Sequence, residues 1–165
     1  MTTSPSHLNV VLAKKNDRPV LERLWVMFRH DMSAFTGDLP DERGRFRQER
    51  LDASLAEPAW AAYWFRLGSA AVKFALVRGL DADERVISSF FIAHGARRLG
   101  VGRAAVRQVT RQRAGRWCIA YQDSNTVASR FWSAGAADAD DLWALEHRPG
   151  RRDFPADAWV QFVVR

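Results

Sequence analysis

The spacing of apolar residues in the first third of the chain predicts a strand followed by two helices. Apolar residues crowd residues 8–13 ("LNVVLA"), which indicates a strand. A helical stripe follows, in which apolar side chains recur at intervals of three or four residues. Its members are Leu21, Leu24, Trp25, Phe28, Met32 and Phe35. Asp17 is placed to cap this helix, whose first turn tolerates Pro19. "TGDLPDERG" ends it, and residues 45–55 predict a second, short and polar helix.

From residue 61 the apolar spacing changes to the two-residue period of a sheet. Two runs flank the turn "LGS" and predict a hairpin, and a third run follows the turn "GLDADE". The three predicted strands are residues 61–66, 71–78 and 85–92. A helix to about Arg113 is expected next, with Val101, Ala105 and Val109 facing inward.

The remainder of the chain predicts a strand, a helix and two final strands. They are residues 116–121, residues 125–134 with Gly135 as the helix-ending residue, "LWALEH" and "AWVQFVV". The expected order is therefore β-α-α-β-β-β-α-β-α-β-β. This order predicts a mixed α/β fold, with a single domain over residues 1–165.

The charge of the chain adds the expectation of an anionic partner. The formal net charge is +6, the sequence pI is about 10.4, and nearly all of the 25 basic residues are arginine. Such a balance suits nucleotides, coenzyme A, nucleic acid or an anionic membrane surface. A generally Arg-rich and Ala-rich composition explains the total charge equally well, so the position of the charges matters more than their sum.

Several features disfavour other classes of protein. Cys118 is the only cysteine, which excludes an internal disulfide and fits a reducing cytoplasm. No histidine flanks it in the sequence, so we interpret it as buried packing rather than a nucleophile. We expect no signal peptide and no membrane span, because no run approaches about 18 apolar residues. The four histidines are widely spaced, and no metal site is expected.

One stretch, "ARRLGVGRAA" at residues 96–105, places three arginines and two glycines where a helix begins. A helix start carries partial positive charge, so each cation there is unfavourable by about 0.3–1 kcal/mol. Arg103, Arg107 and Arg111 then recur every four residues, a spacing at which like charges repel. Glycines let a backbone approach a ligand closely, and the first N–H groups of a helix lack intrahelical partners. We therefore favour a bound polyanion over a solvated basic face.

The same stretch carries a resemblance to a known family. Arg97, Gly100 and Gly102 follow "VISSFFI" and resemble the acetyl-CoA signature R/Q-x-x-G-x-G/A of the GCN5-related N-acetyltransferases, the GNAT superfamily. "NTVASRFW" at residues 125–132 resembles the second cofactor segment of that family, N-x-x-A-x-x-F-Y, with Trp132 where Tyr is usual. The predicted order of elements is similar to the family fold over nearly the whole chain, and "HDMSAFTG" is similar to a bacterial branch.

The resemblance implies an acetyl-CoA site on the backbone of the arginine-rich turn. It implies that the diphosphate of coenzyme A lies on the amides of residues 98–103, and that the pantetheine arm lies like an added strand beside residues 91–93. It further implies that Asn125 hydrogen-bonds this arm, a role compatible with capping its helix. The expected cofactor-binding residues are Phe91, Ile92, Ala93, Arg97, Arg98, Leu99, Gly100, Val101, Gly102, Arg103, Asn125, Ala128 and Trp132.

The usual catalytic pair of the family does not carry over. Many relatives place a Glu base on the strand before the signature, where this chain has Ser88 and Ser89. Many also use as the acid the Tyr that is replaced by Trp132, whose indole N–H is not a useful proton source.

Three residues remain as catalytic candidates. Tyr121 is a candidate acid, or an ordinary strand aromatic. Ser89 (or Ser88) is a candidate to hold a water that relays a proton, or is small polar packing. His30 and the neighbouring Asp31 are candidates to bind or deprotonate an amine, although a helix-end histidine also gains from the helix dipole.

Together these features predict transfer of an acetyl group from acetyl-CoA to the primary amine of a small molecule. Acetylation of a protein or aminoacyl substrate stays open, as does a catalytically silent acyl-CoA-binding module. Nucleic-acid binding through the basic run of residues 97–116 is disfavoured, because the run lacks interleaved aromatic residues. Homodimerisation is left open.

Overall fold

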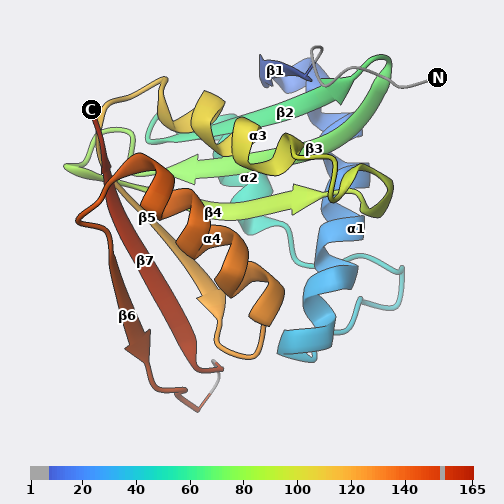
Figure 1. Cartoon of the computed structure of the whole chain (residues 1–165). Coiled ribbons are helices and arrows are strands. Elements are labelled where there is room, and N and C mark those ends of the chain that lie inside the picture. Colours follow the sequence, from blue (N-terminus) through green and yellow to red (C-terminus); the bar gives the residue numbers. More distant parts are fainter. Residues whose placement is uncertain (1–7, 153–154) are drawn as a thin grey trace.

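The computed structural model describes residues 8–152 and 155–165 and is built around one mixed β-sheet of seven strands (Figure 1). The strands are β1 (Leu8–Leu12), β2 (Trp60–Leu67), β3 (Ala70–Arg78), β4 (Glu84–Ile92), β5 (Gly115–Gln122), β6 (Ala144–Arg148) and β7 (Asp157–Val164). Their order across the sheet is β1-β2-β3-β4-β5-β7-β6. Neighbouring strands are antiparallel except β4 and β5, which run parallel and are joined by a helical crossover.

Two helices cover each face of the sheet (Figure 1). The helices α1 (Arg18–Thr36) and α2 (Glu49–Ala56) cover what we call the α1 face. The helices α3 (Val101–Thr110) and α4 (Thr126–Ala139) cover the opposite face, called the α3 face. Two 3-10 helices, η2 (Lys15–Asp17) and η3 (His94–Ala96), precede α1 and α3.

The predicted periodicities account for the two cores. Four members of the apolar stripe on α1 are buried, and the last two, Met32 and Phe35, are half-buried. The inward-facing residues predicted for α3, namely Val101, Ala105 and Val109, are also buried. Cys118 is buried in β5, and burial raises the pKa of its thiol to about 12, as expected for packing rather than catalysis. The predicted order of helices and strands is confirmed.

Two helix boundaries differ from the prediction. The predicted start of α2 at residue 45 is wrong, because the Asp41 carboxylate accepts hydrogen bonds from the N–H groups of Arg43 and Arg45 and forms a turn there. The predicted end of α4 at Gly135 is also wrong, since the helix continues to Ala139. It ends where the Asp140 carboxylate accepts backbone hydrogen bonds from later residues, which stabilises the change of direction.

The prediction that the Asp17 side chain caps α1 is wrong as well. Asp17 stands at the N-cap position but makes no side-chain bond to the helix. Its carboxylate instead accepts from the Lys14 N–H at 2.8 Å and closes η2. Pro19 lies in the first turn, as expected. Among the described residues, no helix is long and apolar enough to cross a membrane.

Candidate functional site

The two parallel strands at the centre of the sheet separate toward their C-terminal ends. β4 and β5 are paired only over Glu84–Ile87 and Arg116–Ile119. The rest of β4 is still paired with β3 through Ile92, but it has no ladder to β5 (Figure 1). Residues 88–92 of β4 therefore present one backbone edge that no described strand covers, which we call the β4 edge.

A bulge at Ser88 begins this separated part of β4. Ile87 and Ser89 pair with consecutive residues of β3, so Ser88 is an extra residue. Such bulges kink a strand and increase its twist, which turns β4 away from β5. The Ser88 carbonyl accepts a hydrogen bond from Arg50 Nη1 of α2 at 2.9 Å, and its hydroxyl donates to the Leu76 carbonyl at 3.3 Å. The Ser88 hydroxyl therefore already has a hydrogen-bond partner within the sheet.

The remaining backbone groups of the β4 edge follow from strand alternation. The Ala93 N–H donates to the Val72 carbonyl on β3 at 2.8 Å. Successive residues of a strand point their backbone groups to opposite sides. Phe90 and Ile92 therefore direct theirs toward the side that β5 has left, and the Ile92 carbonyl accepts from Arg97 Nε at 2.8 Å.

The chain from β4 to α3 forms a turn with unusual backbone angles, which we call the α3 turn (residues 97–102). Arg98 has φ +64°, which is unfavourable by about 1–2 kcal/mol for a residue with a side chain. Gly100 has φ +71° and occupies the N-cap position, so no side chain caps the helix. The first N–H groups of α3 consequently have no capping acceptor. Local strain of this kind is concentrated at ligand-binding sites.

The two glycines of the motif serve different purposes. An added Cβ on Gly100 would meet open space, so its left-handed backbone is what requires glycine. An added Cβ on Gly102 would lie 2.8 Å from Phe131 Cε2 and 2.9 Å from Ile92 Cδ1. Gly102 therefore allows α3 to pack closely on α4 and β4. The expectation that both glycines serve mainly for close approach of a ligand is corrected for Gly102.

The arginines near the α3 turn are only partly free. Arg103 and Arg107 both pair with Asp138 of α4, Arg103 through its Nε at 2.7 Å and Arg107 at 3.7 Å. Asp138 therefore reduces the repulsion between the arginines of α3. From the sequence alone, a bound polyanion is expected to supply all of that reduction. Arg98 is exposed and has no side-chain partner among the described residues. Leu99 is exposed beside it.

Arg97 points away from the first turn of α3. Its Nη2 donates to Asp31 Oδ2 of α1 at 2.5 Å, and its Nη1 lies 3.1 Å from His94 Nε2. With the bond to the Ile92 carbonyl, Arg97 links the end of β4 to α1. The first arginine of the motif is therefore held by the protein itself.

The second motif forms the beginning of α4. The Asn125 Oδ1 accepts from the Ala128 N–H at 3.0 Å, which confirms the helix-capping role. Trp132 is buried and lies edge-on to Phe90 and Phe131, with ring centroids 5.1 and 4.8 Å apart. Trp132 therefore packs against β4 from the α3 face.

Two of the three catalytic candidates lie on the strands that separate. Tyr121 is near the end of β5, beyond its last pairing with β4, and its hydroxyl donates to Ser129 Oγ of α4 at 3.3 Å. Ser89 is buried directly after the bulge, and its hydroxyl has no hydrogen-bond partner among the described residues. An unpaired buried hydroxyl is suited to holding a water or a substrate group.

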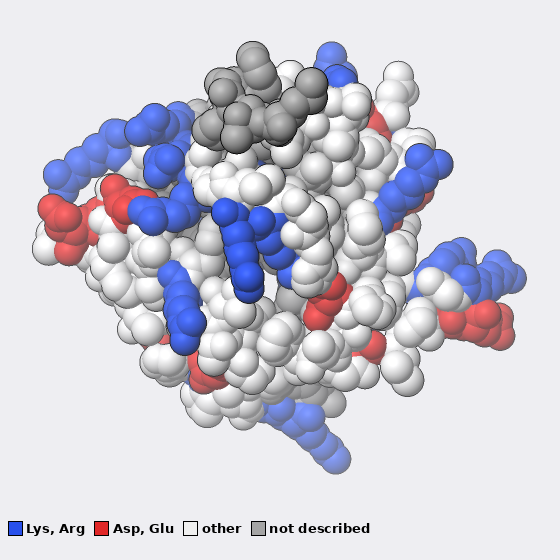
Figure 2. All heavy atoms as spheres, turned by 45° about the vertical axis from the view of Figure 1, so that its right-hand side comes forward, with Lys and Arg blue, Asp and Glu red and all other residues white. Residues whose placement is uncertain are grey.

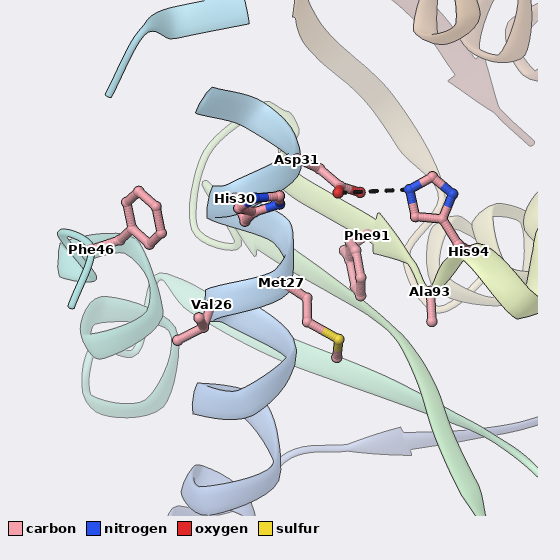
Figure 3. Close-up of a pocket in the computed structure, with 8 residues that line it drawn as sticks. All are labelled: Val26, Met27, His30, Asp31, Phe46, Phe91, Ala93 and His94. Carbon is pink, nitrogen blue, oxygen red and sulfur yellow. Dashed lines mark ion pairs between the residues drawn. The ribbon is translucent and has the colours of Figure 1, made fainter. Parts of the chain in front are cut away.

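The third candidate, His30, lies in a groove along α1. A cavity of about 400 Å³ is lined by Val26, Met27, His30, Asp31, Phe46, Phe91, Ala93 and His94, which we call the α1 groove (Figure 3). Met27 and Asp31 point toward Phe91 and His94, whereas Val26 points toward the side of Phe46 (Figure 3). Asp31 Oδ1 lies 3.7 Å from His94 Nε2, so the carboxylate faces both His94 and Arg97.

Basic side chains are prominent on one face of the molecule (Figure 2). Figure 2 brings forward the side that carries α1 and the α3 turn, where Lys and Arg side chains predominate over Asp and Glu and several surround a hollow. The described residues contain no group of three or more His, Cys, Asp or Glu side chains that could hold a metal ion.

Comparison with known proteins places this arrangement in a well-populated fold. No family model matches the sequence, and no curated protein matches it. Solved structures do match. An acetyltransferase from Thermus thermophilus is 19% identical with a TM-score of 0.71, covering 96% of this chain and 97% of that one. The spermidine N-acetyltransferase of Vibrio cholerae, solved with CoA and spermine, is 10% identical with a TM-score of 0.68, covering 96% of both chains.

A third match names the fold family. A GNAT-family acetyltransferase from Staphylococcus aureus is 12% identical with a TM-score of 0.67, covering 96% of this chain and 99% of that one. The chain therefore has a mixed α/β fold, and that fold is the one shared by the GNAT acetyltransferases.

Several residues of the site have no signal in the sequence. Arg50 and Phe46 come from a segment without a motif and reach the site only through the packing of α1 and α2. The bond between Arg97 and Asp31 joins residues far apart in the chain, which neither periodicity nor spacing reveals.

Proposed function

We propose that this protein is an acetyl-CoA-dependent N-acetyltransferase that acetylates the primary amine of a small molecule. One observation supports this most strongly: the uncovered β4 edge leads directly to the uncapped first turn of α3. An extended chain that ends in a diphosphate, as acetyl-CoA has, matches an open strand edge followed by a helix N-terminus.

The backbone supplies most of the proposed cofactor site. The N–H groups of Val101, Gly102 and Arg103 have no capping side chain and would receive the diphosphate, with the free Arg98 beside them. The backbone groups of residues 90 and 92 would hydrogen-bond the pantetheine arm, as a neighbouring strand would. Acetyl-CoA supplies a thioester, whose carbonyl is the electrophile of the reaction.

The α1 groove is the proposed seat of the acceptor amine. Val26, Met27 and Phe91 make its walls largely apolar, and Asp31 is the one carboxylate among its described lining residues. A single carboxylate in an apolar groove suits one ammonium group on an apolar body better than it suits a polyamine. Arg97 holds Asp31 in a fixed orientation, and so sets where the ammonium group can bind.

The reaction requires an amine without its proton and a proton for the departing thiolate. In the proposed mechanism a water held by the Ser89 hydroxyl accepts the proton of the acceptor ammonium and passes it to solvent, and His30 helps to bind the amine in the α1 groove. The amine nitrogen would then bond to the thioester carbonyl carbon, the carbon–sulfur bond would break, and the Tyr121 hydroxyl would donate a proton to the sulfur. The second proton that the nitrogen loses as the amide forms would restore the Tyr121 hydroxyl. Ser129 hydrogen-bonds that hydroxyl and fixes its position.

A catalytically silent acyl-CoA-binding module is the second candidate function. It is favoured by Trp132, which is buried where the family resemblance leads one to expect a tyrosine, and by Ser88, whose hydroxyl is already bonded to Leu76. Neither residue can donate or accept a proton in the way that the usual catalytic pair does.

A release assay distinguishes the two functions. Purified protein is mixed with acetyl-CoA and a panel of apolar monoamines, polyamines and amino acids, and free CoA thiol is measured. We expect thiol release with apolar monoamines, and loss of most of it in Asp31→Asn. Binding of CoA without thiol release for any amine would favour the silent module, and absence of CoA binding would contradict both.

A further inference from the structure

Lys73 is a buried ionisable side chain that the proposed chemistry does not use. It lies on β3, is 0% exposed, and its ammonium nitrogen has no hydrogen-bond partner among the described residues. Burial lowers the pKa of Lys73 to about 8, and no neighbouring charge contributes to that shift. Buried charges are normally paired. A buried ammonium group without a partner among the described residues is suited to an anion that binds from outside the chain.

The choice of lysine at this position is itself informative. The chain has three lysines, Lys14, Lys15 and Lys73, and all its other basic residues are arginines. Lys14 and Lys15 are exposed. The buried position thus carries the basic side chain that can lose its proton, whereas an arginine would remain charged at any ordinary pH.

Strand register places Lys73 beneath the first turn of α3. Lys73 is directly opposite Ile92 on β4 and Phe65 on β2. Directly opposed residues share a face, with their Cβ atoms about 4.5–5.5 Å apart. Phe65 belongs to the core of the α3 face, and Ile92 Cδ1 lies 2.9 Å from where a Cβ of Gly102 would be. The Lys73 side chain therefore lies beside the residue that supports the α3 turn.

The charged groups on the elements around this position are mostly positive. The ionisable groups on the elements around Lys73 are Tyr63 and Arg66 of β2, Glu84 and Arg85 of β4, Arg97 and Arg98 of the α3 turn, and Arg103 and Arg107 of α3, the last two paired with Asp138 of α4. None of them forms a hydrogen bond or ion pair with Lys73. The N-terminal end of α3 adds partial positive charge of its own. An anion bound at the α3 turn would relieve this accumulation.

We propose that Lys73 is a buried counter-charge for the diphosphate of coenzyme A. This proposal rests on the proposed function and adds to it a residue from the interior of the sheet. The protonated side chain strengthens binding of the diphosphate at the α3 turn, and the bound diphosphate in turn favours the protonated side chain. Lys73 is a positioning residue for the cofactor and takes no part in acetyl transfer.

The proposal fixes the sign of a pH effect. A bound anion favours the charged form, so Lys73 should keep its proton to a higher pH in the complex than in the free protein. The extra affinity is fully present below about pH 8, where Lys73 is protonated in both states, and is lost as the pH rises through the range between the two pKa values. Within that range, binding takes up as much as one proton, and affinity falls by at most about tenfold per pH unit.

Calorimetric titration with a non-hydrolysable thioether of CoA tests the proposal. Wild type, Lys73→Met and the control Lys15→Met, which removes the same charge from an exposed site, are titrated at about pH 7, 8 and 9. We expect Lys73→Met to bind roughly tenfold more weakly at about pH 7, with little further loss at about pH 9. Lys15→Met should follow wild type throughout.

Proton uptake by wild type tests the same idea without a variant. Titration at about pH 8.5 in two buffers of different ionisation enthalpy should show uptake of a fraction of a proton on binding. Absence of uptake, or equal affinities and equal pH dependence for wild type and Lys73→Met, would overturn the role of Lys73 while leaving the cofactor site intact. Failure of wild type to bind the thioether would instead overturn the proposed function.

Discussion

The proposed cofactor region is formed mainly by backbone groups, whereas the proposed acceptor region is formed by side chains. The β4 edge and the α3 turn offer mainly backbone groups: an unpaired strand edge, two left-handed residues and an uncapped helix start. The α1 groove offers side chains that come from α1, the segment before α2, the end of β4 and η3. A site made of backbone groups requires glycines at fixed spacing, so it can be recognised as a motif in the sequence. A groove lined by side chains is formed by residues that are far apart in the sequence, so it has no such motif.

Arg97 joins the two regions. It lies in the α3 turn, yet its guanidinium bonds the Ile92 carbonyl and the Asp31 carboxylate. Apart from this link the two regions are separate, so changes in the cofactor region should alter CoA affinity and kcat. Changes in the α1 groove should alter KM for the amine and leave CoA affinity unchanged.

The largest effect is expected from alanine substitution at the two motif glycines, Gly102 and Gly100. Gly102→Ala forces a Cβ against Phe131 and Ile92, and overpacking of this kind destabilises by about 1–3 kcal/mol. Gly100→Ala should cost about 1–2 kcal/mol through its positive φ alone. Gly95→Ala is the matched control, because a Cβ there meets open space without a left-handed backbone. Urea unfolding measures all three, and a Gly102→Ala protein as stable as the control would contradict the close packing.

The next largest effect is expected at Asp31. Asp31→Asn removes the charge that faces the acceptor, and a charge-assisted hydrogen bond of about 1.5–3 kcal/mol corresponds to a KM roughly tenfold to a hundredfold higher. CoA affinity should stay within about twofold. Asp38→Asn, which also leaves an arginine without its partner but lies outside the α1 groove, is the control. Steady-state kinetics with a responsive amine give both constants, and equal KM values for the two variants would remove Asp31 from the acceptor site.

A kcat effect without a KM effect is expected at Tyr121. Tyr121→Phe should lower kcat by about tenfold if its phenol protonates the thiolate, and leave amine KM unchanged. The other tyrosine, Tyr63, is buried on the same face but lies on β2, away from the separated strands. Tyr63→Phe should leave kcat unchanged, so a similar loss in both variants would indicate a packing effect only.

The smallest effect is expected at His30. Without a strong side-chain base, kcat/KM should rise with pH from about 6.5 toward the pKa of the substrate amine, with no plateau set by the enzyme. His30→Ala should raise KM by a few-fold and keep the same pH profile. The profile is measured for wild type and variant across about pH 6 to 9. An acidic limb that disappears in His30→Ala would make His30 the general base.

The fold was largely predictable because its elements depend on local pattern. The stripe on α1 buries the residues that its spacing selects, and the apolar runs of β2 to β4 are buried because helices cover both faces of the sheet. The misplaced boundaries depend on single side chains. Asp41 forms a turn where a helix was expected, and Asp140 ends α4 beyond Gly135. The spacing of apolar residues does not show which carboxylate will accept a hydrogen bond from a backbone N–H group.

Only the part of the site that is formed by backbone groups was predictable from the sequence. The motif at the α3 turn located two residues with positive φ and an uncapped helix start. It did not reveal that Arg97 turns to Asp31, that Gly102 is required for packing, or that Lys73 lies beneath the turn. These features depend on contacts between elements, which arise only when the sheet and helices assemble.

Amide hydrogen exchange with and without CoA tests most directly whether the cofactor is held by backbone groups. If it is, CoA should slow exchange in peptides that cover residues 88–92 of β4, where residues 90 and 92 face the open side, and residues 99–103 at the start of α3, where the described residues supply no capping side chain. Peptides from α2 and from the hairpin of β6 and β7 should be unchanged. Unchanged exchange at both the β4 edge and the α3 turn in the presence of bound CoA would contradict a backbone-built cofactor site.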